Sequence, residues 1–362
     1  MTVDPHPPGQ AGADPVPSAR LRAAVPLGAL ALALLLAIVP LHDRLADALN
    51  DALLGWFSTP AKLNDVLVID IDDISLHEVK PWLGPWPFRR ETHALMIDFL
   101  REAGASVIGI AIVFTDAREG DEELKRALAG PGAPVVLAAA GLRQPVDAEH
   151  DAQRTFDALA GLHTSVAPAS APASHWPALA LPSAGLLAAL PQAPRLGVIS
   201  APLSDDGRLR RLPLLHEVNG RLLTAFPLTM QLATMAQPRL DYDAARRVFN
   251  AGSTPWPVDS QGMAGVAFPR APDALQHLRY SELAAAMLGR RDANALRQLI
   301  KGRAVFVGSS AFFGDGVMTA AGQLSGTALL ALSYAALRDG SLNKPGDTSL
   351  GKSIFNNQTK QL

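Results

Sequence analysis

The sequence predicts an α/β fold, with a mainly parallel sheet sandwiched by helices, an antiparallel hairpin insertion and one preceding transmembrane helix. Three observations lead to this prediction. Short apolar runs alternate with helical segments, which is typical of βαβ units. The dipeptide Asn219-Gly220 separates two apolar runs, as in a two-residue hairpin. An uncharged segment near the N-terminus is long enough to cross a bilayer.

The predicted domain opens with a βαβ unit. The run Val66–Asp73 is apolar and rich in β-branched residues before it ends in acids, which indicates a buried strand. A turn rich in proline and tryptophan follows at Pro81–Pro87. Arg89–Ala103 has apolar residues at helical spacing, and Gly104 ends this helix because glycine accepts a left-handed backbone. The second strand is Val107–Phe114, so the unit predicts a parallel pair joined by a right-handed crossover.

The rest of the domain continues this alternation without an internal repeat. The further predicted elements are a charged helix at 121–129, a strand at 134–140, an irregular Ala/Pro/Ser-rich region at 166–194, a small strand at 195–200, a hairpin turn at 205–211, a hairpin at 212–222 and beyond, an apolar helix at 225–235 and a buried strand at 303–307. Strands separated by helices, with one antiparallel insertion, indicate a single α/β domain, which we place at residues 45–340.

Composition excludes several classes of function. The formal net charge is −2, so nothing in the charge balance suggests a nucleic-acid partner. The chain has no cysteine, which excludes disulfide scaffolds, thiolate metal sites and thiol nucleophiles. No Gly-x-Gly-x-x-Gly motif and no His-x-x-x-His spacing occurs, and we expect no cofactor and no metal.

A membrane anchor is predicted at residues 23–41, after a disordered tail at 1–22. The segment has no charge and, as a helix, reaches about 28 Å, the hydrocarbon thickness of a bilayer. A buried core helix and a cleaved signal peptide are the alternatives, but the segment lacks the polar stripe of the first and the cleavage site of the second. Arg20 and Arg22 precede the segment, so we expect a single-pass inner-membrane protein with its main domain outside the cytoplasm.

Two carboxylates mark the first candidate site. Asp70 and Asp72 lie two residues apart on a strand, so their side chains share a face. They stand at its carboxyl end, where open α/β sheets bind ligands. Close carboxylates hold a cation or raise one another's pKa. In the alternative, they cap the next helix or pair with Arg89 and Arg90.

Two further segments carry candidate polar groups. Gly308-Ser309-Ser310 follows a buried strand and predicts a tight turn, with an anion-binding nest of backbone N–H groups as the functional alternative. His93 lies four residues after Arg89 on one helical face and could meet Asp72 or Asp73, with a solvated or capping histidine as the alternative. The candidate ligand-binding residues are Asp70, Asp72, Asp73, Arg89, His93, Ser309, Ser310 and Asp315. We assign no catalytic residue.

One enzyme class has to be considered. The run Asp70-Ile71-Asp72 after an apolar strand resembles the Asp-x-Asp motif of haloacid dehalogenase-type phosphohydrolases, in which the first Asp is the nucleophile and Mg²⁺ bridges to a later acidic loop. Gly314-Asp315-Gly316 resembles that later loop, but Thr319 stands where its second acid is expected. This hypothesis stays an alternative, as does a purely structural interaction module.

The chain as a whole resembles the second type of CHASE extracytoplasmic sensor domain of bacterial membrane receptors. The matching stretches are Val68-Ile69-Asp70-Ile71-Asp72-Asp73-Ile74-Ser75-Leu76, Trp86-Pro87-Phe88-Arg89 with His93, Ala105–Phe114, Asp206-Gly207-Arg208-Leu209-Arg210-Arg211-Leu212-Pro213-Leu214 and Leu299–Ala311. The resemblance implies an anchored, non-catalytic domain that senses a small-molecule or peptide signal. In that family three more membrane helices and a cytoplasmic output domain follow.

The departures from the family pattern predict a degenerate or truncated receptor. Ala111 stands where the family has an acid, and Ala328 and Leu330 stand where it has a Glu and a His. Residues 341–362 form a polar, irregular tail in place of membrane helices, which suggests a truncated or shifted reading frame, with an ordinary linker as the alternative. A single anchor can transmit a signal only if two chains associate, so a homodimer is the expected assembly.

Overall fold

The computed structural model describes residues 32, 61–144, 157–159, 167–191, 195–204, 206–252, 254–266, 274–311, 316–319 and 322–342. The chain divides into two units, Met1–Leu53 and Leu54–Leu362, and nearly all described residues belong to the second. The predicted anchor at 23–41 lies outside the described residues except for Leu32, which is helical and exposed. Within the described ranges no helix is both long enough and apolar enough to cross a bilayer.

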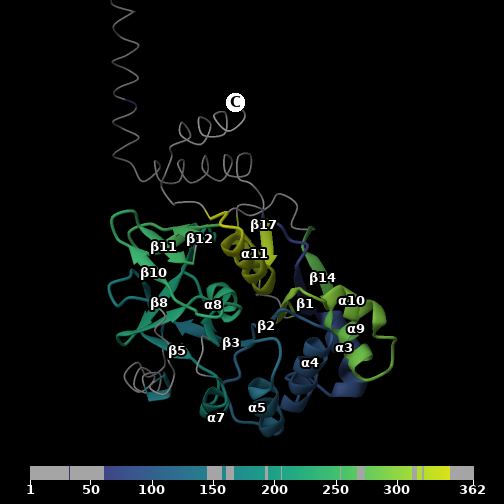
Figure 1. Cartoon of the computed structure of the whole chain (residues 1–362). Helices are drawn as coiled ribbons and strands as arrows, with labels where there is room; N and C mark the ends of the chain where they lie inside the picture. The colour runs from purple at the N-terminus through teal and green to yellow at the C-terminus, as the bar shows by residue number, and fades with distance from the viewer. Residues whose placement is uncertain are drawn as a thin grey trace, which may run out of the picture. The chain divides into compact units, whose positions relative to one another are not determined.

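A seven-stranded, mostly parallel sheet forms the centre of the second unit (Figure 1). In spatial order its strands are β14 (Gln276–Arg279), β1 (Val66–Ile71), β15 (Ala304–Ser309), β2 (Val107–Ile110) and β3 (Val135–Leu142), with β6 (Leu196–Val198) parallel and β5 (Ala178–Ala180) antiparallel to β3. The predicted α/β class with a mainly parallel sheet is therefore confirmed for this unit.

The predicted βαβ unit exists, with two differences. β1 and β2 are parallel, but β15 lies between them, so the crossover passes over one strand. The helix α4 (Arg90–Glu102) lies where the pattern predicted it, and Gly104 has the left-handed φ of +82°. The predicted turn at 81–87 is wrong at its start, because a helix, α3 (Asp73–Leu83), runs through Pro81.

Helices cover both faces of the sheet. Alternate residues along each central strand face opposite sides, so β1 contributes Leu67 and Ile69 to one core and Val66 and Val68 to the other. The helices of the first core are α3, α4, α5 (Asp121–Ala129), α7 (Ala184–Ala188), α9 (Tyr280–Met287) and α10 (Asn294–Ile300). The second core is covered by α8 (Phe226–Ala233) and α11 (Gly326–Arg338).

In the described part of the chain, small strands form four further sheets, in which all pairs are antiparallel except β4–β8, and this is more than the single hairpin insertion predicted. The hairpin at Asn219-Gly220 is confirmed, and both turn residues have positive φ as a two-residue turn requires. The small strands are β4 (Ser174–His175), β8 (Leu215–Val218) and β9 (Arg221–Thr224) in one sheet, β10 (Asp241–Asp243), β11 (Val248–Ala251) and β12 (Thr254–Pro257) in another, and the pairs β7 (Arg211–Pro213) with β13 (Met263–Gly265) and β16 (Gly316–Thr319) with β17 (Gly322–Ser325).

Two other predictions need correction. The region 166–194 is not wholly irregular, since its described part contains β4, β5 and α7. Gly207 does form the predicted turn, but β7 after it pairs with β13 and not with the strand before the turn. Both errors concern which distant segment becomes the partner, and local patterns do not contain that information.

Candidate functional site

The carboxyl ends of β1 and β15 bring several predicted site residues together. The two strands are direct neighbours, with Asp70 opposite Gly308 and Ile71 opposite Ser309. The expectation that the first strand and the late buried strand lie side by side is thus confirmed. In open α/β sheets this edge is where ligands bind.

Asp70 and Ser310 hold each other across this edge. The backbone N–H of Ser310 donates to Asp70 Oδ1 at 3.0 Å, and its hydroxyl donates to Oδ2 at 2.6 Å. The Ser309 hydroxyl donates to the Ile71 carbonyl oxygen at 2.9 Å. The predicted tight turn is wrong, because Gly308 and Ser309 are the last residues of β15. The Ser310 amide does bind an anion, and that anion is the carboxylate of Asp70.

Asp72 and Asp73 serve the next helix. Asp72 Oδ1 accepts the backbone N–H of Ser75 at 2.7 Å and thereby caps α3, while Asp72 Oδ2 lies 3.5 Å from Arg279 Nε. Asp73 is exposed in the first turn of α3, where a negative charge is favourable. The capping alternative therefore holds for Asp72, but its ion-pair partner is Arg279 and not Arg89 or Arg90.

Arg89 lies apart from the carboxylates of β1. Its Nε is 2.8 Å from a carboxylate oxygen of Glu91, and its guanidinium also binds Glu119. Its neighbour Arg90 is buried, pairs with Asp121 at 3.2 Å and stacks over Phe114 at 4.4 Å. Burial lowers the pKa of Arg90, and the Asp121 carboxylate opposes this effect. The described contacts thus place Arg89 in an acidic surface network.

His93 is buried and not solvated, which corrects one interpretation from the sequence. Its side chain is 1% exposed and lies among aromatic rings, with centroid distances of 5.0 Å to Phe114 and 6.4 Å to Phe88. Burial, with a smaller effect from the nearby Arg90 charge, lowers its pKa to about 3. The imidazole is therefore neutral at physiological pH.

Sequence reasoning missed Tyr280, which lies in the same aromatic cluster. Tyr280 starts α9 directly after β14 and stacks on Phe88 at 5.4 Å. Its buried hydroxyl and the Nδ1 of His93 have no hydrogen-bond partner in the described part of the chain. Burial also raises the pKa of Tyr280. No local motif marks Tyr280, because its surroundings arise only when β14 is added beside β1.

On the other face of the sheet, away from the His93 and Tyr280 cluster, the first turn of α11 covers the carboxyl edge. A Cβ at Gly308 would lie 2.0 Å from Thr327 Oγ1, so glycine lets the first turn of the helix rest on β15. Asp70 and Ser310 follow the strand residues that face this side. Ala328 and Leu330 are buried in the same core, and Ala111 packs at its border. The three positions predicted to depart from the family pattern therefore lie on one face of the sheet.

Two predicted features are left without a structural outcome. Asp315 lies in the segment 312–315, outside the described residues. In the part of the chain that the structure describes, no group of three or more His, Cys, Asp or Glu side chains could hold a metal ion.

The protein is a three-layer α/β domain, in which polar side chains at the carboxyl edge of the sheet bind one another across two central strands. The family follows from comparison, since the family model of the CHASE2 domain matches residues 28–352. The chain therefore belongs to the CHASE2 family of extracytoplasmic sensor domains. Comparison with curated proteins and with solved structures gave no match.

Proposed function

We propose that this chain is the extracytoplasmic sensor region of a bacterial membrane receptor, that it is not catalytic, and that its signal site has lost most of its affinity. The observation that carries the proposal is the CHASE2 match over residues 28–352, which includes most of the predicted anchor at 23–41. The proposal places the anchor in the inner membrane and includes the association of two copies of the chain.

The carboxyl edge on the α11 side is the proposed place of signal binding. Asp70 is half-buried there, and its negative charge also reaches His277 on β14. Partial desolvation lowers the pKa of His277, and the Asp70 charge opposes that effect. A small molecule or peptide with a donor group would compete with Ser310 for the Asp70 carboxylate. Such competition changes the contact between β1 and β15, directly under the first turn of α11.

An export reporter tests the topology on which the proposal depends. A reporter that is active only after export, fused near residue 150, is expected to be active. A cytoplasm-only reporter at the same position serves as the matched control and is expected to be silent. Activity of the cytoplasmic reporter and silence of the exported one would refute the sensor assignment.

The two alternative functions have separate tests. Magnesium-dependent phosphatase activity that disappears in Asp70→Asn would favour the phosphohydrolase. Asp72 is already engaged with Ser75 and Arg279, so that reaction would first have to release it from the helix cap. A domain that binds only protein, with no small molecule changing the melting temperature of either the unmodified chain or Ala111→Asp, would favour the structural interaction module.

A further inference from the structure

The last described helix, α11, runs through the second core as a buried rod. Its 13 residues span about 20 Å along the axis, and every residue from Thr327 to Leu337 is buried. A helix that is apolar all round is packed on several sides. α11 packs on β15 through Tyr334, whose ring lies 5.5 Å from that of Phe306.

The first turn of α11 lies at the carboxyl edge of the sheet. Thr327 rests on Gly308, which is the residue opposite Asp70 in the neighbouring strand. The Ser325 hydroxyl oxygen accepts the backbone N–H of Ala328 at 3.2 Å and so caps the helix. Because Gly308 has no side chain, the backbone at the end of β15 contacts α11 directly. A displacement of this end of the strand therefore acts on the helix.

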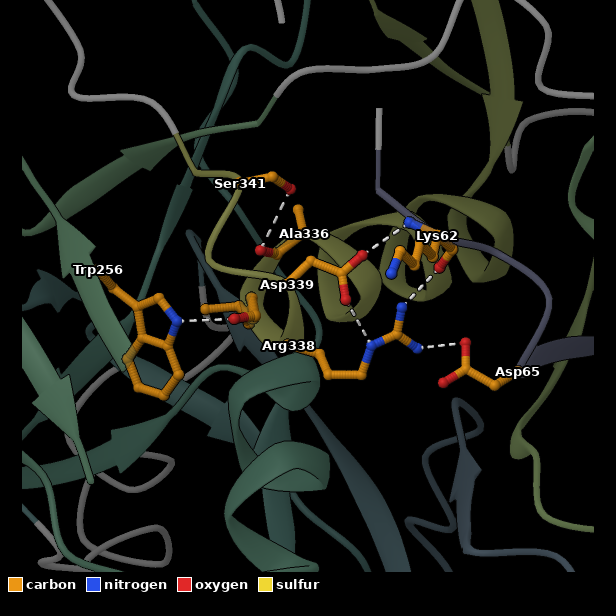
Figure 2. A network of polar contacts seen from close by, with 8 residues as sticks. Lys62, Asp65, Trp256, Ala336, Arg338, Asp339 and Ser341 are labelled. Carbon is orange, nitrogen blue, oxygen red and sulfur yellow. Dashed lines mark hydrogen bonds and ion pairs between the residues drawn. The ribbon is translucent and has the colours of Figure 1, made fainter. Parts of the chain in front are cut away.

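The last turn of α11 lies at the opposite edge, where the chain enters β1. Figure 2 shows four residues that we call the entry–exit clamp, Lys62, Asp65, Arg338 and Asp339. Arg338 binds Asp65 through Nη1 at 2.5 Å, the Lys62 carbonyl oxygen through Nη2 at 2.6 Å and Asp339 through Nε at 2.8 Å. The Lys62 backbone N–H donates to Asp339 Oδ2 at 2.7 Å.

The clamp is a connected set of polar contacts at the surface, in which the side chain of Asp65 is 53% exposed. The side chains of Arg338 and Asp339 are only 19% and 23% exposed. Although desolvation opposes ionisation, the pKa of Asp339 is lowered because Arg338 and the Lys62 N–H bind its carboxylate. The Trp256 indole N–H donates to the Leu337 carbonyl oxygen at 2.8 Å and fixes the same helix end (Figure 2).

These contacts join two segments that are far apart in the sequence. Residues 61–65 lead into β1, and residues 339–342 leave α11, yet both are held by Arg338 and Asp339. Asp65 is also tied to the sheet, because its carbonyl oxygen accepts the Ala304 N–H at 2.9 Å. β15 thus contacts the first turn of α11 through Gly308, and it contacts the clamp through Ala304 at the other end of the strand.

We infer that α11 and the entry–exit clamp form a coupling device, which makes the entering and leaving segments move as one unit when the carboxyl edge changes. This inference rests on the proposed function for the identity of the edge as the signal site. The inference of coupling rests on the contacts at the two ends of α11, because rigid packed elements transmit a displacement when they have two discrete arrangements.

Hydrogen exchange of the purified full chain tests the clamp without a ligand or a membrane. Arg338→Gln is expected to raise exchange at least tenfold in both 62–66 and 339–341, while β3 stays protected. Arg239→Gln is the matched control, because it removes an exposed ion pair, with Asp241, outside the clamp. Faster exchange in only one of the two segments would overturn the inference that they are tied together.

A second arm tests the coupling along α11. Asp70→Asn weakens the contact with Ser310 at the far edge and is expected to raise exchange at 62–66 and 339–341 at least threefold. Unchanged exchange there would overturn the coupling, even if the clamp itself is real. If Arg338→Gln does not fold, Arg338→Lys keeps the charge but cannot make the three contacts, and the same two outcomes apply. A failed export test would refute the proposed function and leave these measurements unaffected.

Discussion

Buried titratable side chains set the behaviour of this domain at the scale of single residues. His93 and His216 are both fully buried, and desolvation lowers the pKa of each to about 3. The Trp176 indole N–H donates to His216 Nδ1 at 2.9 Å, so the neutral ring carries its proton on Nε2. Both imidazoles are uncharged in the folded state at neutral pH.

Acid is expected to destabilise the domain through these two histidines. Their folded pKa lies below the unfolded value near 6.5, so the unfolded state binds more protons as pH falls below 6.5. From pH 8 to pH 5 each histidine lowers the free energy of unfolding by about 2 kcal/mol. Urea unfolding of the wild type and His93→Leu measures the difference, and the variant is expected to have a flatter pH dependence.

The matched control is His77→Gln, which changes an exposed histidine on α3. It is expected to keep the pH dependence of the wild type. If His93→Leu and His77→Gln show the same slope between pH 5 and pH 7, burial of a neutral His93 is contradicted.

The two carboxylates that follow β1, Asp72 and Asp73, also differ in their contribution to stability. Asp72→Ala removes the cap of α3 and the contact with Arg279, so it is expected to cost about 1 kcal/mol of stability. Asp73→Ala removes only a favourable first-turn charge and is expected to cost about 0.3 kcal/mol. Thermal unfolding of both variants ranks them, and equal losses would contradict the capping role.

At the scale of elements, β15 and α11 approach each other closely at the proposed site. Gly308 has no steric room for a side chain, and its backbone does not require a positive φ. The glycine is therefore explained by the neighbouring helix and not by the strand. The same helix carries the clamp at its other end, so its position on the sheet matters at both edges.

Gly308→Ala is expected to destabilise the domain by about 1–3 kcal/mol, because the new methyl group overlaps Thr327. Thr327→Ala is expected to recover part of this loss, since it removes the atom nearest the new Cβ. Gly185→Ala is the matched control, because its Cβ would meet only the flexible end of Lys125. Denaturant unfolding gives the cycle, and strictly additive single effects would rule out a direct contact.

At the scale of the whole molecule, the fold brings together the three apolar residues that are predicted to replace polar residues of the family pattern. Ala111 follows β2, whereas Ala328 and Leu330 belong to α11, and the fold places all three on the α8–α11 face. Each polar group lost at a ligand site forfeits about 1.5–3 kcal/mol of charge-assisted hydrogen bonding. Three such losses weaken binding by several orders of magnitude, at about 1.4 kcal/mol per tenfold.

The purified chain is therefore expected to fold but to show no saturable response in a thermal-shift screen of small molecules. Ala111→Asp is expected to keep the fold, because Ala111 is only half-buried at the border of the core. Circular dichroism checks the fold of both proteins. A ligand that binds the unmodified chain at micromolar concentration would contradict the predicted degeneracy.

The sequence by itself determined the elements that depend on local chemistry. The strand β1 was predictable because Val66–Ile69 is apolar on both faces, and α4 because its apolar residues recur at helical spacing. Asn219-Gly220 specified its hairpin because both residues tolerate a positive φ. The family motifs were also visible in the sequence, and the CHASE2 match confirms them.

Only the tertiary structure decided which distant groups meet. The position of β15 between β1 and β2 brings Ser310 to Asp70, and no local pattern specifies that order. His93 was misread because the rings that bury it come from separate segments, which propensity does not describe. Helix α3 was missed because Pro81 indicated a turn, while the Asp72 cap and packing on α9 outweigh the proline near the helix end. Long-range packing contributes more free energy than local preference at these positions, so the site follows from the fold.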